Sequence, residues 1–483
     1  MLIKKNDKIK LHINAMTSEG SGIGRYKPDA DSDKDGLAVF VRGTVPGDDI
    51  IAHIIKVSRN YAVGIIDELL SPSSQRIESE CPYSKQCGGC SFWQMTYDEE
   101  LKYKLQRVND AVSRVGKIDF ECDKILPADD IKHYRNKAEY PVRIVNGTLT
   151  AGFYAYKSHR VIPVRDCLLQ PPEFQAGIDA IAGWAKVSGV TSFDEQTGRG
   201  LLRHIYLRKA AGTGEIAVCL VINGRGVPNE KLLIDEILTA LPAVKSISVN
   251  INRERTNVIL GDETRILWGN EKICDTLTPK TDSNDRTYKF MISPQSFYQV
   301  NHDQCEKLYG LVREFASLDG SETVLDLYCG AGTIGLTLAD CCKKVYGVEI
   351  VPSAIENANA NARLNNIENA QFLCADAFEG AFLLEQRGEK IDLLVLDPPR
   401  KGCSRDLLDL ILSLSIPKIV YVSCDSATLA RDMSFLSLGG YKISRMTAVD
   451  MFPRTPHVET VVLLRRGNIL VDGERNVSRW TIG

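Results

Sequence analysis

From about residue 290 onwards, short apolar runs alternate with longer stretches of helical periodicity. Runs of strand length cover 323–327, 344–349, 370–374, 391–396, 418–423, 441–449 and, with no helical stretch before it, 457–465. Pro352 marks the start of one helix, because proline is tolerated in the first helical turn. Strand–helix alternation of this kind predicts a doubly wound, mostly parallel sheet.

The first 70 residues have a different pattern. Apolar runs with turn signals between them occupy 9–13, 38–41 and 50–57. Glycines punctuate 20–24, and Pro46-Gly47 is a turn dipeptide. Several short strands at this spacing predict a small closed barrel. The acidic stretch 27–36 is expected to form a hairpin tip.

The middle of the chain mixes both patterns. Thr96 and Glu99 form a capping box, and apolar residues then recur at three- and four-residue steps. This spacing predicts one amphipathic helix over 96–116. Two buried-strand patterns, 216–222 and 246–251, flank a helical stretch at 230–241. The middle is therefore predicted to be α+β.

These patterns divide the chain into four parts. We expect a barrel over 1–70, an α+β unit over 71–288, a doubly wound unit over 289–466 and a polar tail over 467–483. The helix over 96–116 is a candidate to pack on the third part, although it lies within the second in sequence.

Length, apolar content and cysteine content indicate what kind of protein this is. A chain of 483 residues is too long for one ordinary core. No apolar run approaches the ~18 residues needed to cross a bilayer, and the N-terminus lacks the apolar core of a signal peptide. We therefore expect a cytoplasmic protein without a membrane partner. Fourteen cysteines in a reducing compartment favour metal, cluster or catalytic roles over disulfides.

Three of those cysteines lie close together. Cys81, Cys87 and Cys90 fall within ten residues, and two glycines let the backbone wrap tightly around them. Thiolates at this density suit an iron–sulfur cluster or zinc. Either group needs a fourth ligand, and the spacing leaves both Cys122 and Cys167 as candidates.

A basic and aromatic segment follows. Between 131 and 165, seven Lys and Arg residues accompany a single acid, Glu139, and tyrosines and phenylalanine are interleaved. The stretch 197–209 adds further arginines. The net charge of −3 excludes a general polycation, so nucleic-acid binding must come from such a local patch. Basic side chains bind phosphates and aromatic faces stack unpaired bases. The alternative is a solvated sheet face with ordinary core tyrosines.

Candidate chemistry gathers at the predicted strand ends. Cys424 directly follows the run 418–423, and the carboxyl ends of parallel strands face the ligand crevice. A thiol at that position can act as a nucleophile once ionised. The alternative is a small buried hydrophobe. Glu349 ends the second strand and is placed to bind ribose hydroxyls, while Asp397-Pro398-Pro399 follows a later strand.

The loop after the first of these strands fits G-x-G-x-x-G, with Gly330, Gly332 and Gly335. Alone, this motif also suits a nicotinamide-dependent dehydrogenase. A rigid Asp-Pro-Pro loop beside the crevice is instead familiar from methyltransferases that use S-adenosylmethionine. The glycine motif and the Asp-Pro-Pro loop together favour the methyltransferase.

The combination of motifs resembles the RNA uracil-5 methyltransferase family, and within it the RumA-type 23S ribosomal RNA enzymes. Matching stretches are 81–90, 296–301, 326–332, 348–349, 397–400, 422–425, 451–453 and 457–460. The resemblance implies a multi-domain α/β protein. It would have an N-terminal OB-like TRAM barrel, a central α+β domain with a 4Fe-4S cluster, and a C-terminal Rossmann-like domain that binds S-adenosylmethionine. It implies RNA, a 23S loop with a flipped uridine, as the partner; we expect no DNA and a monomer.

The same resemblance assigns ten site residues. The cluster ligands would be Cys81, Cys87, Cys90 and Cys167. The contacts to S-adenosylmethionine would be Gln299, Tyr328, Glu349 and Asp397. Cys424 would be the nucleophile and Glu459 the base. Uracil C5 methylation needs both, because a thiolate must activate the ring and a base must then remove the C5 proton.

Other functions remain as alternatives. A dehydrogenase would leave Cys424 and Glu459 without a use. An amino-methylating enzyme shares Asp-Pro-Pro but usually continues with an aromatic residue that stacks on the base, where this chain has Arg400. A transfer RNA uracil-5 methyltransferase and a non-catalytic RNA-binding iron–sulfur protein also remain open.

Overall fold

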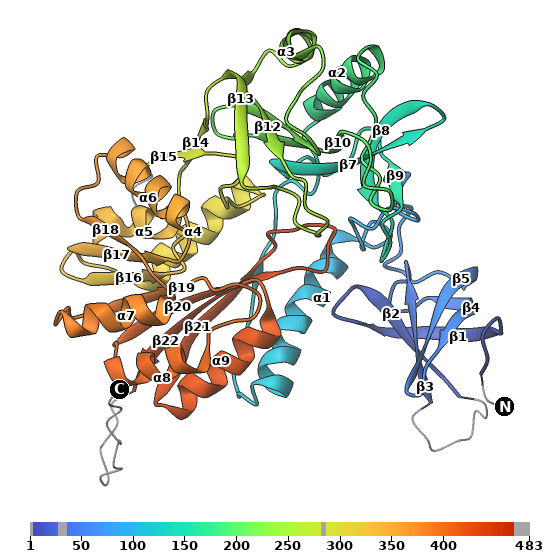
Figure 1. The fold of residues 1–483 in the computed structure, drawn as a ribbon. Coiled ribbons are helices and arrows are strands. Elements are labelled where there is room, and N and C mark those ends of the chain that lie inside the picture. The colour runs from blue at the N-terminus through green and yellow to red at the C-terminus, as the bar shows by residue number, and fades with distance from the viewer. Residues whose placement is uncertain (1–2, 28–35, 282–285, 468–483) are drawn as a thin grey trace.

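The computed structural model describes residues 3–27, 36–281 and 286–467. Within these ranges the strands form a closed five-stranded barrel, a seven-stranded sheet, a two-stranded hairpin and an eight-stranded sheet (Figure 1). The tail predicted from 467 and most of the acidic stretch 27–36 lie outside the described residues. In the described part of the chain, no helix combines the length and apolar character that crossing a membrane requires.

The predicted N-terminal barrel is confirmed. Its strands are β1 (Lys8–Met16), β2 (Ser21–Tyr26), β3 (Leu37–Arg42), β4 (Asp49–Val57) and β5 (Tyr61–Ser71), in the order β1-β2-β3-β5-β4. The glycines at 20–24 do more than mark a turn, because Gly22 and Gly24 lie inside β2. A Cβ at Gly22 would overlap the Thr44 side chain, and one at Gly24 would overlap Leu11. Glycine therefore allows β2 to pack closely across the barrel.

The helix predicted over 96–116 begins as expected. Thr96 caps α1 (Tyr97–Asp110) by accepting a hydrogen bond from the Glu99 N–H. Its last part differs from the prediction, because 111–115 forms a π-helical turn before Gly116. The segment packs on the C-terminal unit, where the π-helical turn and α1 contact α9 (Ser426–Leu438) (Figure 1).

The seven-stranded sheet forms the middle of the molecule. Its order is β13-β12-β11-β10-β7-β8-β9, with β7 (Lys137–Val145), β8 (Thr148–Tyr154), β9 (Val161–Pro163), β10 (Leu202–Lys209), β11 (Ile216–Ile222), β12 (Val244–Ile251) and β13 (Glu263–Gly269). Two helices, α2 (Glu173–Val187) and α3 (Glu230–Ala240), pack on it around an apolar core.

This sheet corrects the prediction of a basic RNA-binding surface over 197–209. Those residues include β10, the middle strand of the sheet, and Arg203 and Arg208 are buried there. Arg203 donates to the Asn252 and Glu254 carbonyls, and Arg208 to the Ser293 carbonyl. These guanidinium groups satisfy the protein's own backbone and do not face solvent.

The eight-stranded sheet confirms the predicted doubly wound fold. Its order is β18-β17-β16-β19-β20-β22-β21-β6, with β16 (Thr323–Leu327), β17 (Lys344–Glu349), β18 (Ala370–Cys374), β19 (Leu393–Leu396), β20 (Lys418–Ser423), β21 (Tyr441–Val449) and β22 (Glu459–Arg466). The helices are α4 (His302–Ala316), α5 (Thr333–Leu338), α6 (Pro352–Leu364), α7 (Ala377–Gln386), α8 (Arg405–Leu414) and α9. The first five strands are parallel, and β22 runs antiparallel between β20 and β21.

Strands β6 and β14, both from before residue 289, complete this unit. The edge strand β6 (Ile125–Leu126) pairs in parallel with β21, with Ile125 opposite Ala448. The hairpin of β14 (Ile273–Leu277) and β15 (Tyr288–Ile292) shares an apolar core with α4 and β16. The methyltransferase-like sheet therefore draws its edge and part of its core from earlier segments of the chain.

Candidate active site and cysteine pocket

Four of the predicted site residues lie at the ends of four adjacent strands. Tyr328 follows β16, Glu349 ends β17, Asp397 follows β19 and Cys424 follows β20. The carboxyl ends of parallel strands meet at one edge of a sheet, so the strand order brings these residues together. Gln299 lies outside this row, in the buried segment just before α4, where its carbonyl accepts from the Asn136 side chain.

The glycine-rich loop after β16 has an unusual backbone. Tyr328 has a φ of 64°, and Gly330 and Gly332 also have positive φ. The Glu349 carboxylate accepts from the Gly330 N–H at 3.2 Å and from the Val351 N–H at 3.0 Å. This contact joins the loop to the end of the neighbouring strand.

Cys424 lies opposite Glu459 where β20 and β22 meet. Ser423 pairs with Thr460 in the antiparallel ladder, so the next position on each strand brings Cys424 and Glu459 across from each other. Glu459 is 4% exposed, whereas Cys424 is half-buried. The structure therefore places a thiol and a carboxyl next to each other at the edge of the sheet where the parallel strands end.

The turn after Cys424 is fixed by its neighbour. The Asp425 side chain caps α9 by accepting from the Ala427 N–H at 3.1 Å and from the Thr428 N–H at 2.9 Å. Ser423 donates to the Asp425 carbonyl. The thiol is thus held on a sharp strand-to-helix turn whose hydrogen bonds are local.

The electrostatics of the pair favour neutral forms in the free protein. Burial, with the Glu459 and Asp397 carboxylates, raises the pKa of Cys424 to about 11, and Arg400 opposes that rise. Burial and Asp397 raise the pKa of Glu459 to about 8, again opposed by Arg400. Burial raises the pKa of Asp397 to about 7.

Arg400 is the functional candidate that sequence reasoning left without a role. It is exposed, and its carbonyl accepts from the Thr428 hydroxyl at 3.1 Å, which ties its loop to α9. Its charge favours ionisation of both Cys424 and Glu459. The available signal was its position directly after Asp397-Pro398-Pro399.

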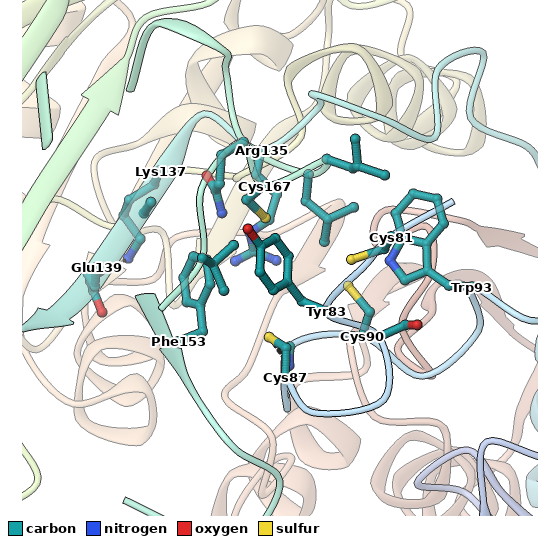
Figure 2. Close-up of a pocket in the computed structure, with 17 residues that line it drawn as sticks. Cys81, Tyr83, Cys87, Cys90, Trp93, Arg135, Lys137, Glu139, Phe153 and Cys167 are labelled. Carbon is teal, nitrogen blue, oxygen red and sulfur yellow. Dashed lines mark hydrogen bonds and ion pairs between the residues drawn. The ribbon is translucent and has the colours of Figure 1, made fainter. Parts of the chain in front are cut away.

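The four predicted cluster cysteines line one cavity of about 320 Å³ (Figure 2). Cys81, Cys87 and Cys90 come from the loop before α1, and Cys167 follows β9. Burial raises the pKa of each thiol, that of Cys167 to about 11. The other sequence candidate, Cys122, lies elsewhere: it is buried in the core of the C-terminal unit, with its thiol directed at the Met446 carbonyl. Of the two candidates, Cys167 lines the cavity with the other three cysteines and Cys122 does not.

The basic stretch 131–165 is less free to bind RNA than its sequence indicates. Acids pair with five of its seven cations: Lys137 with Glu139 of the same stretch, and, from other segments, Lys132 with Glu80, Arg143 with Glu195, Lys157 with Glu19 and Arg165 with Asp179. Tyr134 and Tyr140 are held inside the structure. An open groove lies beside this stretch, formed by 88–89 and 153–159, with Tyr156 36% exposed.

Comparison with known proteins shows the family of this chain. The family model described as tRNA (Uracil-5-)-methyltransferase matches residues 249–467. An uncharacterised RNA methyltransferase of Halalkalibacterium halodurans is 43% identical over 467 residues, which cover 96% of this chain and 98% of that protein. Another, from Clostridium tetani, is 41% identical over 462 residues, which cover 96% of this chain and 97% of that protein.

A solved structure has the same architecture over nearly its whole length. The tRNA (uracil-54, C5)-methyltransferase of Pyrococcus abyssi, in complex with S-adenosyl-L-homocysteine, is 26% identical. It superposes with a TM-score of 0.74, covering 94% of this chain and 99% of that one. With its thiol and carboxyl at the strand ends and relatives that match from end to end, the chain belongs to the RNA uracil-5 methyltransferase family.

Proposed function

We propose that this RNA methyltransferase transfers a methyl group from S-adenosylmethionine to C5 of a uridine through a covalent enzyme–uracil adduct. The observation that carries the proposal is the placement of Cys424 across from Glu459 at the ends of β20 and β22. Cys424 would start the reaction by adding to the uracil ring, and Glu459 would complete it by removing a proton.

The first half of the chemistry requires a thiolate. Uracil C5 is a weak nucleophile, and addition of the Cys424 thiolate to C6 makes C5 enolate-like. Bound S-adenosylmethionine would supply an electrophilic methyl group: C5 bonds to the methyl carbon as the carbon–sulfur bond breaks, and its electron pair stays on sulfur to leave S-adenosylhomocysteine. Cysteine suits this role because its thiolate is soft and polarizable. Arg400 supports the step, since its charge opposes the rise in the pKa of Cys424.

The second half requires a base. After methyl transfer, C5 carries both the new methyl group and its original proton. Glu459 removes that proton, the C5–H electron pair forms the C5=C6 double bond, and the C6–S bond breaks to return the thiolate. A carboxylate whose pKa is raised to about 8 is a stronger base than an ordinary glutamate.

For the methyl donor, we propose contacts from Gln299, Tyr328, Glu349 and Asp397. Three of the four lie along the strand ends, and the left-handed loop at Tyr328 and Gly330 is braced by Glu349. Such a loop lets the backbone approach a nucleoside closely, and a carboxylate at the end of the second strand suits ribose hydroxyls.

We propose that the cysteine pocket holds a 4Fe-4S cluster. A tetrahedral zinc ion with Zn–S bonds of about 2.3 Å would bring its sulfur ligands to about 3.8 Å from one another. Among the described residues, the one compact set of three or more metal-type ligand atoms within 4.8 Å is His302, Asp303 and Glu306, so no three of the pocket thiols are that close. The wider spacing of four thiols around one cavity supports a polynuclear cluster. Methyl transfer needs no external electrons, which favours a structural role.

For the RNA substrate, we propose a loop of 23S ribosomal RNA, with the barrel as a TRAM domain. The resemblance of the cysteine loop and barrel to the ribosomal enzymes supports this choice. Transfer RNA is the second candidate, because the matching family model and the Pyrococcus abyssi enzyme are both named for it. Mapping 5-methyluridine in 23S and transfer RNA from cells with and without the gene decides between them. An unchanged map in both RNAs would contradict the proposed function.

A further inference from the structure

The loop that precedes Glu459 is fixed by many hydrogen bonds from other segments of the chain. Residues 450–456 make up most of the connection between β21, which ends at Val449, and β22, which begins at Glu459. Six of the loop's backbone carbonyls accept hydrogen bonds from donors in other segments of the chain, and those donors are Gln304, Asn301, Lys104, Tyr134, Ser91 and Arg107. Such a loop has little freedom to move without breaking several of these bonds.

A buried charge cluster lies under this loop. Lys104 is fully buried and donates to Glu100 at 2.7 Å, to Asp450 at 2.5 Å and to the Phe452 carbonyl at 3.1 Å. Removing one member of a buried ionic group is costly, because its partners keep their charges in a low dielectric. The cluster therefore ties helix α1 firmly to the loop.

Arg454 connects the same loop to the cysteine-rich segment. Its N–H donates to Glu100 at 2.7 Å, and its guanidinium donates to the Phe92 carbonyl at 3.2 Å and the Met95 carbonyl at 3.0 Å. Its own carbonyl accepts from the Ser91 N–H at 2.9 Å. The residue is 3% exposed and has a φ of 67°. A non-glycine residue keeps such a backbone only where the surroundings enforce it.

Cys424, Glu349 and Asp397 are positioned by contacts other than those of the loop 450–456. Cys424 lies on a turn fixed by Asp425, and the proposed donor-binding residues Glu349 and Asp397 end different strands. Of Cys424 and Glu459, only Glu459 follows the loop 450–456 closely in sequence, with two residues between them. A change in that loop should therefore displace the base and leave the nucleophile in place.

We propose that Arg454 is a positioning residue for the proton-removal step, which it serves by anchoring the loop 450–456 to 91–95 and Glu100 so that the Glu459 carboxyl stays across from Cys424. The inference rests on the proposed function. Arg454 itself takes no part in bond making. It acts through Glu459, and its loss should resemble a partial loss of that base.

The test uses Arg454→Met in the full chain, with RNA of the natural sequence and RNA in which the target uridine carries fluorine at C5. Fluorine cannot leave as a proton, so every enzyme competent in addition and methyl transfer should be trapped on that RNA. We expect wild type and Arg454→Met to be trapped at equal rates. On natural RNA, Arg454→Met should accumulate the methylated adduct and release it at least ~10-fold more slowly, a fraction of the ~10²–10⁴-fold that a positioned base contributes.

Two controls keep the outcome interpretable. Arg454→Lys retains the charge beside Glu100 but has one amine in place of the guanidinium fork, so its release rate should be intermediate. Arg76→Met breaks a buried ion pair with Asp48 in the barrel and should not accumulate adduct. Release at the wild-type rate by both Arg454 variants, or equal slowing of trapping and release, would overturn the positioning role. No trapping of wild type on fluorinated RNA would instead refute the proposed covalent mechanism.

Discussion

Cys424 and Glu459 lie across from each other one position beyond the Ser423–Thr460 pair, on strands that run in opposite directions. The thiol follows the end of its strand and the carboxyl begins its own. Two separate segments of the chain therefore supply the proposed nucleophile and base, so the two side chains can be substituted one at a time.

Replacing these two residues should stop the reaction at different points. Cys424→Ala should bind RNA and S-adenosylmethionine but form no adduct, because C5 is never activated. Glu459→Gln should add and methylate but then stall, since proton removal by a positioned base contributes ~10²–10⁴-fold. The measurement is denaturing electrophoresis of RNA with label from the methyl donor. A labelled adduct from Cys424→Ala, or wild-type turnover by Glu459→Gln, would show that these roles are wrongly assigned.

The release step should depend on pH through Glu459. A carboxyl removes a proton only when ionised, and burial and Asp397 raise the pKa of Glu459 to about 8. Decay of the labelled adduct should accelerate as the pH rises towards about 8 and level off above it. Glu459→Gln should lack this rise. A release rate that is flat over the same range would mean that another group takes the proton.

The same shift predicts how stability varies with pH. The folded pKa of Glu459 lies above its ordinary value of 4.5, so the folded state holds a proton that the unfolded chain releases. This contribution is complete below pH 4.5 and is lost as the pH rises towards about 8. Glu459→Gln cannot ionise, so its free energy of unfolding should gain relative to wild type over that range. Parallel denaturant titrations measure the difference.

The cysteine pocket should bind iron and give the protein colour. Protein purified without oxygen should be brown, with broad absorbance near ~400 nm from thiolate-bound iron and sulfide. Cys167→Ala should lose this absorbance, because Cys167 lines the cavity. Cys122→Ala is the matched control, since that thiol is buried against Met446 in another core and the colour should persist. Stoichiometric zinc without iron would exclude the cluster.

The groove beside the cysteine loop should contribute to RNA affinity. Tyr156 is exposed there and Arg42 stacks on its ring at 4.4 Å. Base–aromatic stacking contributes ~1–3 kcal/mol, so Tyr156→Ala should weaken RNA binding by about 5- to 150-fold while binding of S-adenosylmethionine is unchanged. Arg165→Ala removes an exposed cation paired with Asp179 and serves as the control. Unchanged RNA affinity in Tyr156→Ala would place the RNA elsewhere.

The C-terminal unit could be predicted from sequence because its signals are local. Apolar runs and helical periodicity located its strands to within about two residues, and the turn at Cys424 followed from one strand and one cap. Strand β2 was missed because Gly22 and Gly24 read as a turn, whereas their small size serves packing across the barrel. A local pattern cannot show which atoms will lie opposite a glycine.

The location and partners of charged side chains were the hardest features to predict from sequence. Arg203 and Arg208 looked like an RNA surface, yet they are buried against backbone carbonyls from distant segments. Sequence spacing could not decide between Cys122 and Cys167 as the fourth ligand candidate. In the fold, Cys167 lines the cavity and Cys122 lies in another core. The anchoring role inferred for Arg454 also depends on partners far away in sequence. These contacts arise from tertiary structure and leave no periodic signal in the chain.

The bond between Lys104 and Asp450 has a consequence for how the protein is made. The two residues are 346 positions apart in sequence. Strand β6 likewise pairs with β21, which is synthesised much later. During synthesis, helix α1 must emerge long before the strands it will cover, and such long-range pairing forms late. A ribosome that stops early would release a chain without the loop before Glu459. The proposed active site is therefore incomplete until translation has passed Glu459, at the start of β22.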